Sequence, residues 1–178
     1  RVLTQDELIQ NCIFILNAGH ETTTSLVSNS VRLFLNNPAQ YCMLVEDPDL
    51  ITTAVEECLR VESPLQIGNR QAGEDINLGH HRIKNGTYIH TSIAGANRDP
   101  TAVAVPDTFD INRRPNKHIA FITGIHVCLG ATLARMEGRI ALGKLFQRFP
   151  KMAANGMAAR LPLARFRGFT RLPVKLHS

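Results

Sequence analysis

One cysteine of the sequence stands where its sulfur could bind a metal. Cys128 lies in the run Phe121-Ile122-Thr123-Gly124-Ile125-His126-Val127-Cys128-Leu129-Gly130, and apolar residues recur at helical spacing directly after it. A cysteine just before a helix lies near the free N–H groups and the positive end of the helix dipole, which favour the thiolate. One thiolate is enough to hold haem iron. A lone cysteine is more often a small buried hydrophobic residue, but the glycines and the histidine around Cys128 favour a ligand.

A second candidate group is Ala18-Gly19-His20-Glu21-Thr22-Thr23, in the middle of a predicted helix. Glycine inside a helix costs about 0.5–1 kcal/mol relative to alanine, which suggests a reason such as the close approach of a flat ligand. The next residues place an acid beside a hydroxyl, and a threonine can bond back to the preceding turn and make room for water. The alternative is a helix that simply tolerates polar residues.

A third candidate is the pair Glu57 and Arg60. Residues three apart share a helix face, and a solvated pair of this kind contributes only about 0.3–0.5 kcal/mol. A surface pair is therefore the default interpretation. If the pair is buried instead, another loop must supply partners for the five N–H donors of the guanidinium.

Helix and turn signals predict where these residues lie. Thr4 and Glu7 form a capping box that begins a long helix, Pro38 can open a second helix, and Asn85-Gly86 predicts a β-hairpin between residues 82–84 and 87–89. The predicted parts are a long helix at 4–36, a helix at 48–62 with Glu57 and Arg60, a β-rich part at 65–93, a loop-rich segment at 97–128, a last helix at 129–149 and a tail at 150–178.

The composition indicates one domain of a mainly α fold with a small β portion. The chain has 178 residues, 44% of them hydrophobic and 20% charged, and the apolar runs are too short for a membrane span. Its net charge of +5 comes without a basic run interleaved with aromatic residues, so we expect no nucleic-acid partner. The cysteines lie far apart without a CxxC pair, which disfavours a zinc site or a disulfide framework and favours the cytoplasm.

Five motifs in order, AGHETT, ExxR, ANRDP, FDxxR and FxxGxHxCLG, resemble the cytochrome P450 family of the soluble bacterial type. The resemblance runs from Thr4 to the end and implies an incomplete α+β fold, the C-terminal portion of the family's. It implies haem b with Cys128 as the axial thiolate, and a helix over the distal face of the haem. By the same resemblance Glu21 and Thr22 are catalytic, haem contacts come from Ala18, Gly19, Arg70, Phe121, Gly124, His126 and Gly130, and Glu57, Arg60 and Arg113 are structural.

The resemblance also implies an activity and partners. The activity is insertion of one oxygen atom of O₂ into a small apolar substrate, with electrons from NAD(P)H through a ferredoxin-type donor. Arg135, Arg139 and Lys144 either dock that donor or form a solvated face. The alternative function is non-catalytic: a truncated P450-like partner or remnant with weak or no haem binding.

Two departures from the family pattern bear on these expectations. Ile122 follows Phe121 where the family usually has glycine, and if this position needs a positive φ the cost is about 1–2 kcal/mol. The family's chain is also more than twice as long. A long-helix face without its usual cover is expected to self-associate or to bind a complementary N-terminal half.

Overall fold

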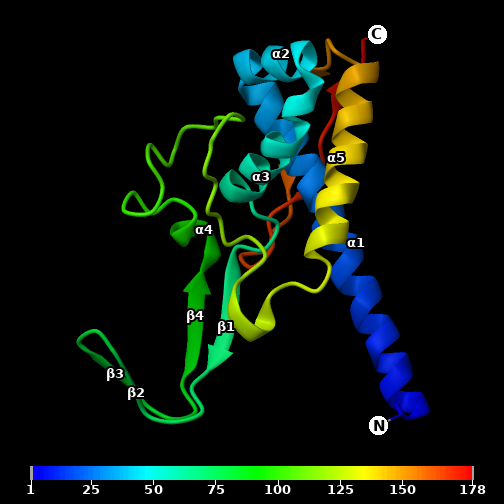
Figure 1. Ribbon diagram of the computed structural model, residues 1–178. Helices are drawn as coiled ribbons and strands as arrows, with labels where there is room; N and C mark the ends of the chain where they lie inside the picture. Colours follow the sequence, from blue (N-terminus) through cyan, green and yellow to red (C-terminus); the bar gives the residue numbers. More distant parts are fainter. Residues whose placement is uncertain (1, 178) are drawn as a thin grey trace.

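The longest element of the fold begins at the capping box. The computed structural model describes residues 2–177, and its first helix, α1, spans Gln5–Asn36 (Figure 1). The Thr4 hydroxyl accepts the N–H of Glu7 at 3.3 Å, and the Glu7 carboxylate accepts the N–H of Thr4 at 2.9 Å. These bonds satisfy donors that a helix start otherwise leaves open.

Three more α-helices pack against the C-terminal half of α1. They are α2 (Pro38–Glu46), α3 (Ile51–Val61), which follows the short 3-10 helix η1 (Pro48–Leu50), and α5 (Ala131–Arg148). Phe34 of α1 lies at the centre, with its ring centroid 4.9 Å from that of Phe146 and 5.3 Å from that of Phe109. Burying a side chain of this size contributes about 1.5–3 kcal/mol. The main core therefore lies among the helices.

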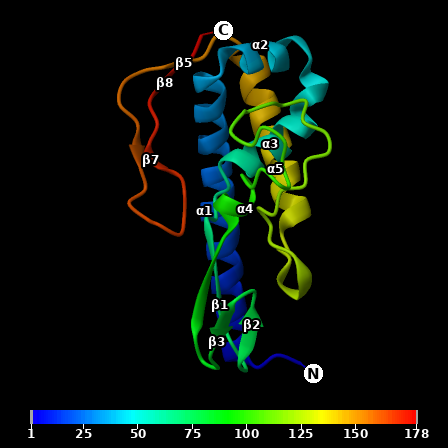
Figure 2. The ribbon, with the colours of Figure 1, turned by 90° about the vertical axis from the view of Figure 1, so that its left-hand side faces the viewer.

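The strands between α3 and α4 form an arm of two antiparallel pairs (Figure 2). Strand β1 (Ile67–Gln71) pairs with β4 (Tyr88–Ser92), and β2 (Ile76–Leu78) pairs with β3 (His81–Ile83). A short helix, α4 (Ile93–Ala96), follows β4.

The predicted hairpin across Asn85-Gly86 is wrong. The turn forms, with Gly86 at φ +81°, but β3 on one side of it pairs with β2 and β4 on the other side pairs with β1. Asp75 explains part of the difference, because its carboxylate accepts the backbone N–H of Asn85 and the ammonium of Lys84, both at 2.9 Å. These bonds hold the end of β3 beside the start of β2, while β4 is free to form the longer pairing with β1.

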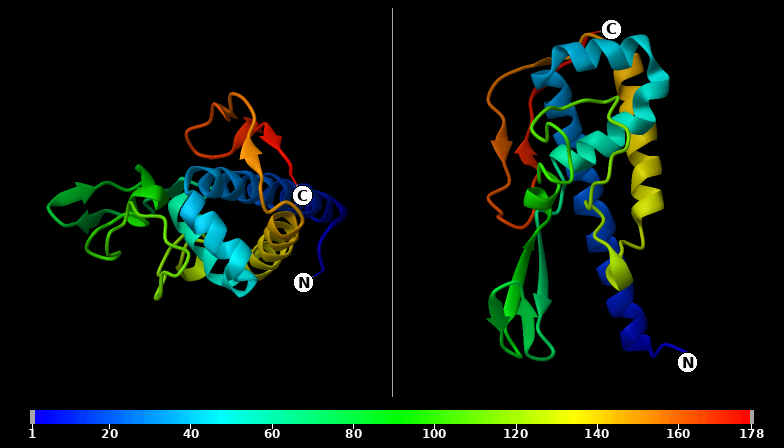
Figure 3. Two further views of the ribbon diagram at one scale, coloured as in Figure 1. Left: turned by 90° about the horizontal axis from the view of Figure 1, so that it is seen from above. Right: turned by 60° about the vertical axis from the view of Figure 1, so that its left-hand side comes forward.

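A loop connects the β arm to α5, and a strand-poor tail ends the chain. The loop contains the 3-10 helix η2 (Gly124–His126). In the tail, β5 (Ala153–Ala154) pairs with β8 (Val174–Lys175), and β6 (Ala159–Arg160) pairs with β7 (Phe169–Arg171). The tail runs along the C-terminal half of α1 (Figure 3).

Burial is uneven along the two long helices. The N-terminal half of α1 projects beyond the other helices in Figure 1, and buried residues in α1 begin only at Ser25. On α5 the buried residues are Gly138, Leu142 and Phe146. Among the residues that the structure describes, no helix is long and apolar enough to cross a membrane. The exposed apolar side chains of the two helices are Leu8, Ile9, Ile13, Phe14, Ile15 and Leu16 on α1, and Leu133, Met136 and Ile140 on α5.

Candidate functional site

The cysteine loop, residues 121–130, presents its sulfur at the start of α5. The N–H of Cys128 donates to the carbonyl of Phe121 at 3.0 Å, which closes the loop, and the N–H of Ala131 donates to the carbonyl of Cys128 at 3.2 Å. The side chain of Cys128 is exposed. It lies two residues before Gly130, the N-cap residue of α5.

Two residues of this loop have left-handed backbone conformations. Gly124 has φ +75° and Ile122 has φ +61°. The left-handed region costs a residue with a Cβ about 1–2 kcal/mol, and a β-branched side chain is rare there. The position that carries Ile122 thus needs the positive φ that glycine adopts without strain.

The surroundings of the sulfur fit a large, flat, apolar cofactor. Ile125 and Leu129, on either side of Cys128 in the sequence, are 96% and 98% exposed. A Cβ added to Gly124 or Gly19 would meet nothing within 4 Å, so both backbones are open to close approach. A single thiolate with an apolar rim matches haem, which takes one axial cysteine, better than a zinc site, which takes several ligands.

The remaining predicted haem contacts, Ala18, His126 and Arg70, are at least partly exposed to solvent. Ala18 is exposed on α1 and His126 is exposed in η2, whereas Arg70 is partly buried on β1. The guanidinium of Arg70 donates to the carbonyl of Asn69 at 2.8 Å. The side chains of Arg70 and His126 therefore remain accessible to an anionic group.

The acid and alcohol of α1 lie on an unbroken helix. The hydroxyl of Thr22 donates to the carbonyl of Ala18 at 2.7 Å, and that of Thr24 donates to the carbonyl of His20 at 2.8 Å. Such back-bonds draw the carbonyl toward the side chain and weaken its helical bond. Glu21 is exposed beside Thr22. Glu21 and Thr22 thus lie next to each other at the surface of the helix.

Glu57 and Arg60 are fully buried and bonded to each other. The Nε and Nη2 atoms of Arg60 donate to the two carboxylate oxygens of Glu57, each at 2.8 Å. The other donors of Arg60 reach the carbonyls of Asn97 at 3.0 Å, Pro106 at 2.7 Å and Thr108 at 3.0 Å. All five N–H groups are therefore satisfied, three of them by the loop that follows α4.

The same loop also completes the hydrogen bonding of Glu57. Its carboxylate accepts Nε of Arg113 at 3.2 Å, Nδ2 of Asn116 at 2.9 Å and the N–H of Asp110 at 3.0 Å. Arg113 donates further to the carbonyl of Ala104 at 2.6 Å. The structure thus brings Glu57, Arg60 and Arg113 together as one cluster, which we call the ion-pair cluster.

Glu56, which the sequence analysis did not single out, holds a second cluster. Nε of Arg135 lies 2.8 Å from one of its oxygens, Nη2 of Arg139 lies 3.4 Å from the same oxygen, and Nε2 of His118 lies 3.0 Å from the other. Burial would raise the pKa of Glu56, but His118 and Arg135 outweigh it and lower the pKa to about 2. Two of the arginines considered for donor docking are therefore already paired with a carboxylate. No spacing signal marked Glu56, since its partners lie far along the chain.

The other cysteines do not form one class. The resemblance suggested that Cys12, Cys42 and Cys58 are packing residues, but only Cys58 is buried. Burial raises the pKa of the Cys58 thiol to about 12. Cys12 and Cys42 are exposed because α1 and α2 leave their outer faces uncovered.

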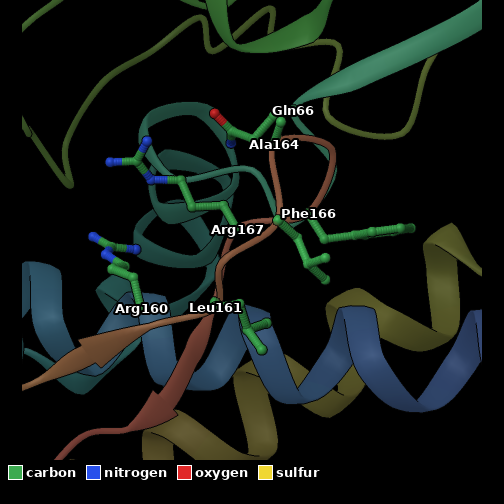
Figure 4. A pocket seen from close by; sticks show the side chains of 8 residues that line it. Gln66, Arg160, Leu161, Ala164, Phe166 and Arg167 are labelled. Atoms are coloured by element: carbon green, nitrogen blue, oxygen red, sulfur yellow. The ribbon is translucent and has the colours of Figure 1, made fainter.

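A cavity of about 280 Å³ lies between the tail and the segment after α3 (Figure 4). Arg160 and Arg167 point to one side of it and Phe166 to the other. Both arginines bind the carboxylate of Glu62, which compensates one of their two positive charges. Among the described residues that line the cavity, none belongs to the predicted site.

The chain thus combines an exposed cysteine before a helix, a residue type that holds the iron in some haem proteins, with the buried pair Glu57 and Arg60. The model of the family Cytochrome P450 matches residues 1–176, and the chain belongs to this family. Its fold is an incomplete α+β P450 fold. The family is one of haem monooxygenases.

Several bacterial proteins are similar to the chain. "Biotin biosynthesis cytochrome P450" of Bacillus subtilis (strain 168) is 48% identical over 97% of this chain and 44% of its own length. "Vitamin D(3) 25-hydroxylase" of Pseudonocardia autotrophica is 42% identical over 98% of this chain and 44% of its own. The crystal structure of P450BioI in complex with hexadec-9Z-enoic acid ligated acyl carrier protein superposes with a TM-score of 0.96 at 47% identity, covering 98% of this chain and 46% of that one. The chain thus spans less than half the length of these relatives.

Proposed function

We propose that the chain forms the haem-binding part of a monooxygenase that inserts one oxygen atom of O₂ into a small apolar organic substrate. The observation that carries this proposal is the exposed thiol of Cys128, set at the start of α5 among exposed apolar residues. Haem b, held by the thiolate of Cys128, would supply the activation of O₂.

The residues of the chain divide into those that hold the cofactor and those that move protons. Cys128 would hold the iron, and Arg70 and His126 would hold the propionates. The open backbone at Gly19, next to the exposed Ala18, would let this side of α1 approach the cofactor. Glu21 and Thr22 hold and pass protons there, with the Thr22 hydroxyl poised on the carbonyl of Ala18. Phe121, Gly124 and Gly130 shape the cysteine loop.

The proposed substrate class and electron donor rest on the relatives and on charge. The crystal structure of CYP109E1 from Bacillus megaterium is a complex with testosterone, a largely apolar molecule. That protein is 34% identical to the chain and superposes with a TM-score of 0.97, covering 100% of this chain and 50% of that one. A ferredoxin-type donor, carrying electrons from NAD(P)H, fits the net charge of +5 and the exposed Lys144. The four free cysteines fit the reducing cytoplasm.

Isotope labelling tests the proposed reaction. With NADPH, a ferredoxin, its reductase, an apolar test substrate and ¹⁸O₂, the haem-loaded protein should form a product that carries one ¹⁸O atom. The variant Cys128→Ala should form none, whereas Cys42→Ala, which changes an exposed cysteine outside the loop, should retain the activity. Product that carries oxygen from water, or equal product from Cys128→Ala, would contradict the proposal.

We also propose that the exposed face of α1 is covered, either by a second copy of the chain or by a complementary N-terminal half of the P450 fold. The support is the run of exposed apolar side chains from Leu8 to Leu16, since patches of this kind drive association. The protein at micromolar concentration should scatter light as a dimer or larger, and Leu16→Glu should reduce that mass. Leu78→Glu, on the β arm and 64% exposed, is the control. A monodisperse monomer would overturn self-association.

A further inference from the structure

One carboxylate joins three parts of the chain beside the cysteine loop. Glu56 lies on α3, its partners Arg135 and Arg139 lie on α5, and its third partner, His118, lies in the segment that leads to the loop. Both oxygens of Glu56 lie within 2.9 Å of Nε of Arg135, and the side chain of His118 is only 3% exposed. Without the carboxylate of Glu56, these three basic side chains would lie close together with no negative charge between them.

The partners of Glu56 lead directly to the cysteine. The guanidinium of Arg135 lies over the ring of Phe121, 4.5 Å from its centroid, and the ring of His118 lies 6.2 Å from the same centroid. The carbonyl of Phe121 in turn accepts the N–H of Cys128 at 3.0 Å. Two contacts and one hydrogen bond thus connect Glu56 to the backbone of the candidate ligand.

We propose that Glu56 is a positioning residue for Cys128. It holds Arg135 and His118 against Phe121, and it thereby fixes the carbonyl that closes the cysteine loop. This role differs from that of its neighbour Glu57, which bonds to Arg60 and to the loop after α4. The inference deepens the proposed function, because Cys128 is the proposed iron ligand.

Amide hydrogen exchange tests the proposal without depending on haem. In Glu56→Gln, which keeps the side-chain shape but loses the charge, the amides of Ile122 and Cys128 should exchange about tenfold faster than in the parent protein. The amides of α2 should be unchanged. In the haem-loaded protein the same variant should lose haem faster. If the protein binds no haem at all, the proposed function fails while the exchange result still decides the role of Glu56.

Glu62 provides a matched control. Its carboxylate also holds two arginines, Arg160 and Arg167, but these belong to the tail. Glu62→Gln should therefore speed exchange in β6 and β7 and leave the cysteine loop unchanged.

Three outcomes would overturn the proposal: equal acceleration across the whole chain in Glu56→Gln, no acceleration in the loop, or the same loop effect in Glu62→Gln. If Glu56→Gln does not fold, Arg135→Gln is measured in its place. This variant leaves the contact between Glu56 and His118 and removes the one between Arg135 and Phe121. It should accelerate the loop selectively, and an unchanged loop would overturn the proposal.

Discussion

The ion-pair cluster and the cysteine loop are built in opposite ways, although α3 contributes to the support of both. In the cluster, Glu57 and Arg60 are fully buried and every donor of Arg60 has an acceptor. In the loop, every residue from 123 to 130 is exposed, and Ile122 has a strained backbone. Stability is therefore concentrated in the buried cluster, whereas the candidate ligand lies on a weakly held, open segment.

The largest effect should come from breaking the ion-pair cluster. Glu57→Gln removes the charge that compensates the buried guanidinium of Arg60, so the free energy of unfolding should fall by about 3–5 kcal/mol. Urea unfolding measures this change. Glu46→Gln, at an exposed position on α2, should change it by no more than about 0.5 kcal/mol. Equal effects of the two variants would refute the contrast between the regions.

Acid should weaken the bonds by which Glu56 of α3 holds His118 and Arg135 beside the cysteine loop. The pKa of Glu56 is lowered from 4.5 to about 2 in the folded protein, so its contribution is complete above pH 4.5 and is lost as the pH falls from 4.5 to 2. That contribution is on the order of 2 kcal/mol. Urea unfolding at several pH values should show the parent protein and Glu56→Gln converging below pH 4.5. If the difference in free energy of unfolding between the two proteins stays constant down to pH 3, the lowered pKa of Glu56 is contradicted.

Relief of the strain in the cysteine loop should have a smaller effect, and it should raise the free energy of unfolding rather than lower it. Ile122→Gly should have a free energy of unfolding about 1 kcal/mol above that of Ile122→Ala, because both lose the same side-chain packing but only glycine adopts φ +61° without strain. Thermal unfolding monitored by circular dichroism compares the two. If the alanine variant is equally stable, the loop holds no such strain.

Local signals in the sequence predicted much of the fold. The capping box at Thr4 and Glu7 located the start of α1, and Pro38 indicated where α2 begins. The motif residues around Cys128 marked the candidate ligand because a cysteine at a helix start has a distinctive local environment. These features depend on residues within a few positions of one another, which a single sequence displays.

Contacts between distant residues could not be predicted in the same way. The turn at Asn85-Gly86 was recognised, but the pairing of its flanking strands depends on partners up to 25 residues away, since Ile67 of β1 pairs with Ser92 of β4. Glu56 and Glu57 are adjacent in the sequence and alike in type, yet their side chains join different clusters. Only the position of α5 and of the loop before it gives Glu56 its partners.

The spectrum of the reduced, CO-treated protein shows whether Cys128 holds the haem iron. After reconstitution with haem and reduction with dithionite, the protein should show the red-shifted Soret band of a thiolate-ligated haem. The band should be absent in Cys128→Ala and retained in Cys12→Ala, which changes an exposed cysteine on α1. A protein that takes up no haem, or a Cys128→Ala variant that keeps the red-shifted band, would contradict the assignment of Cys128 as the iron ligand.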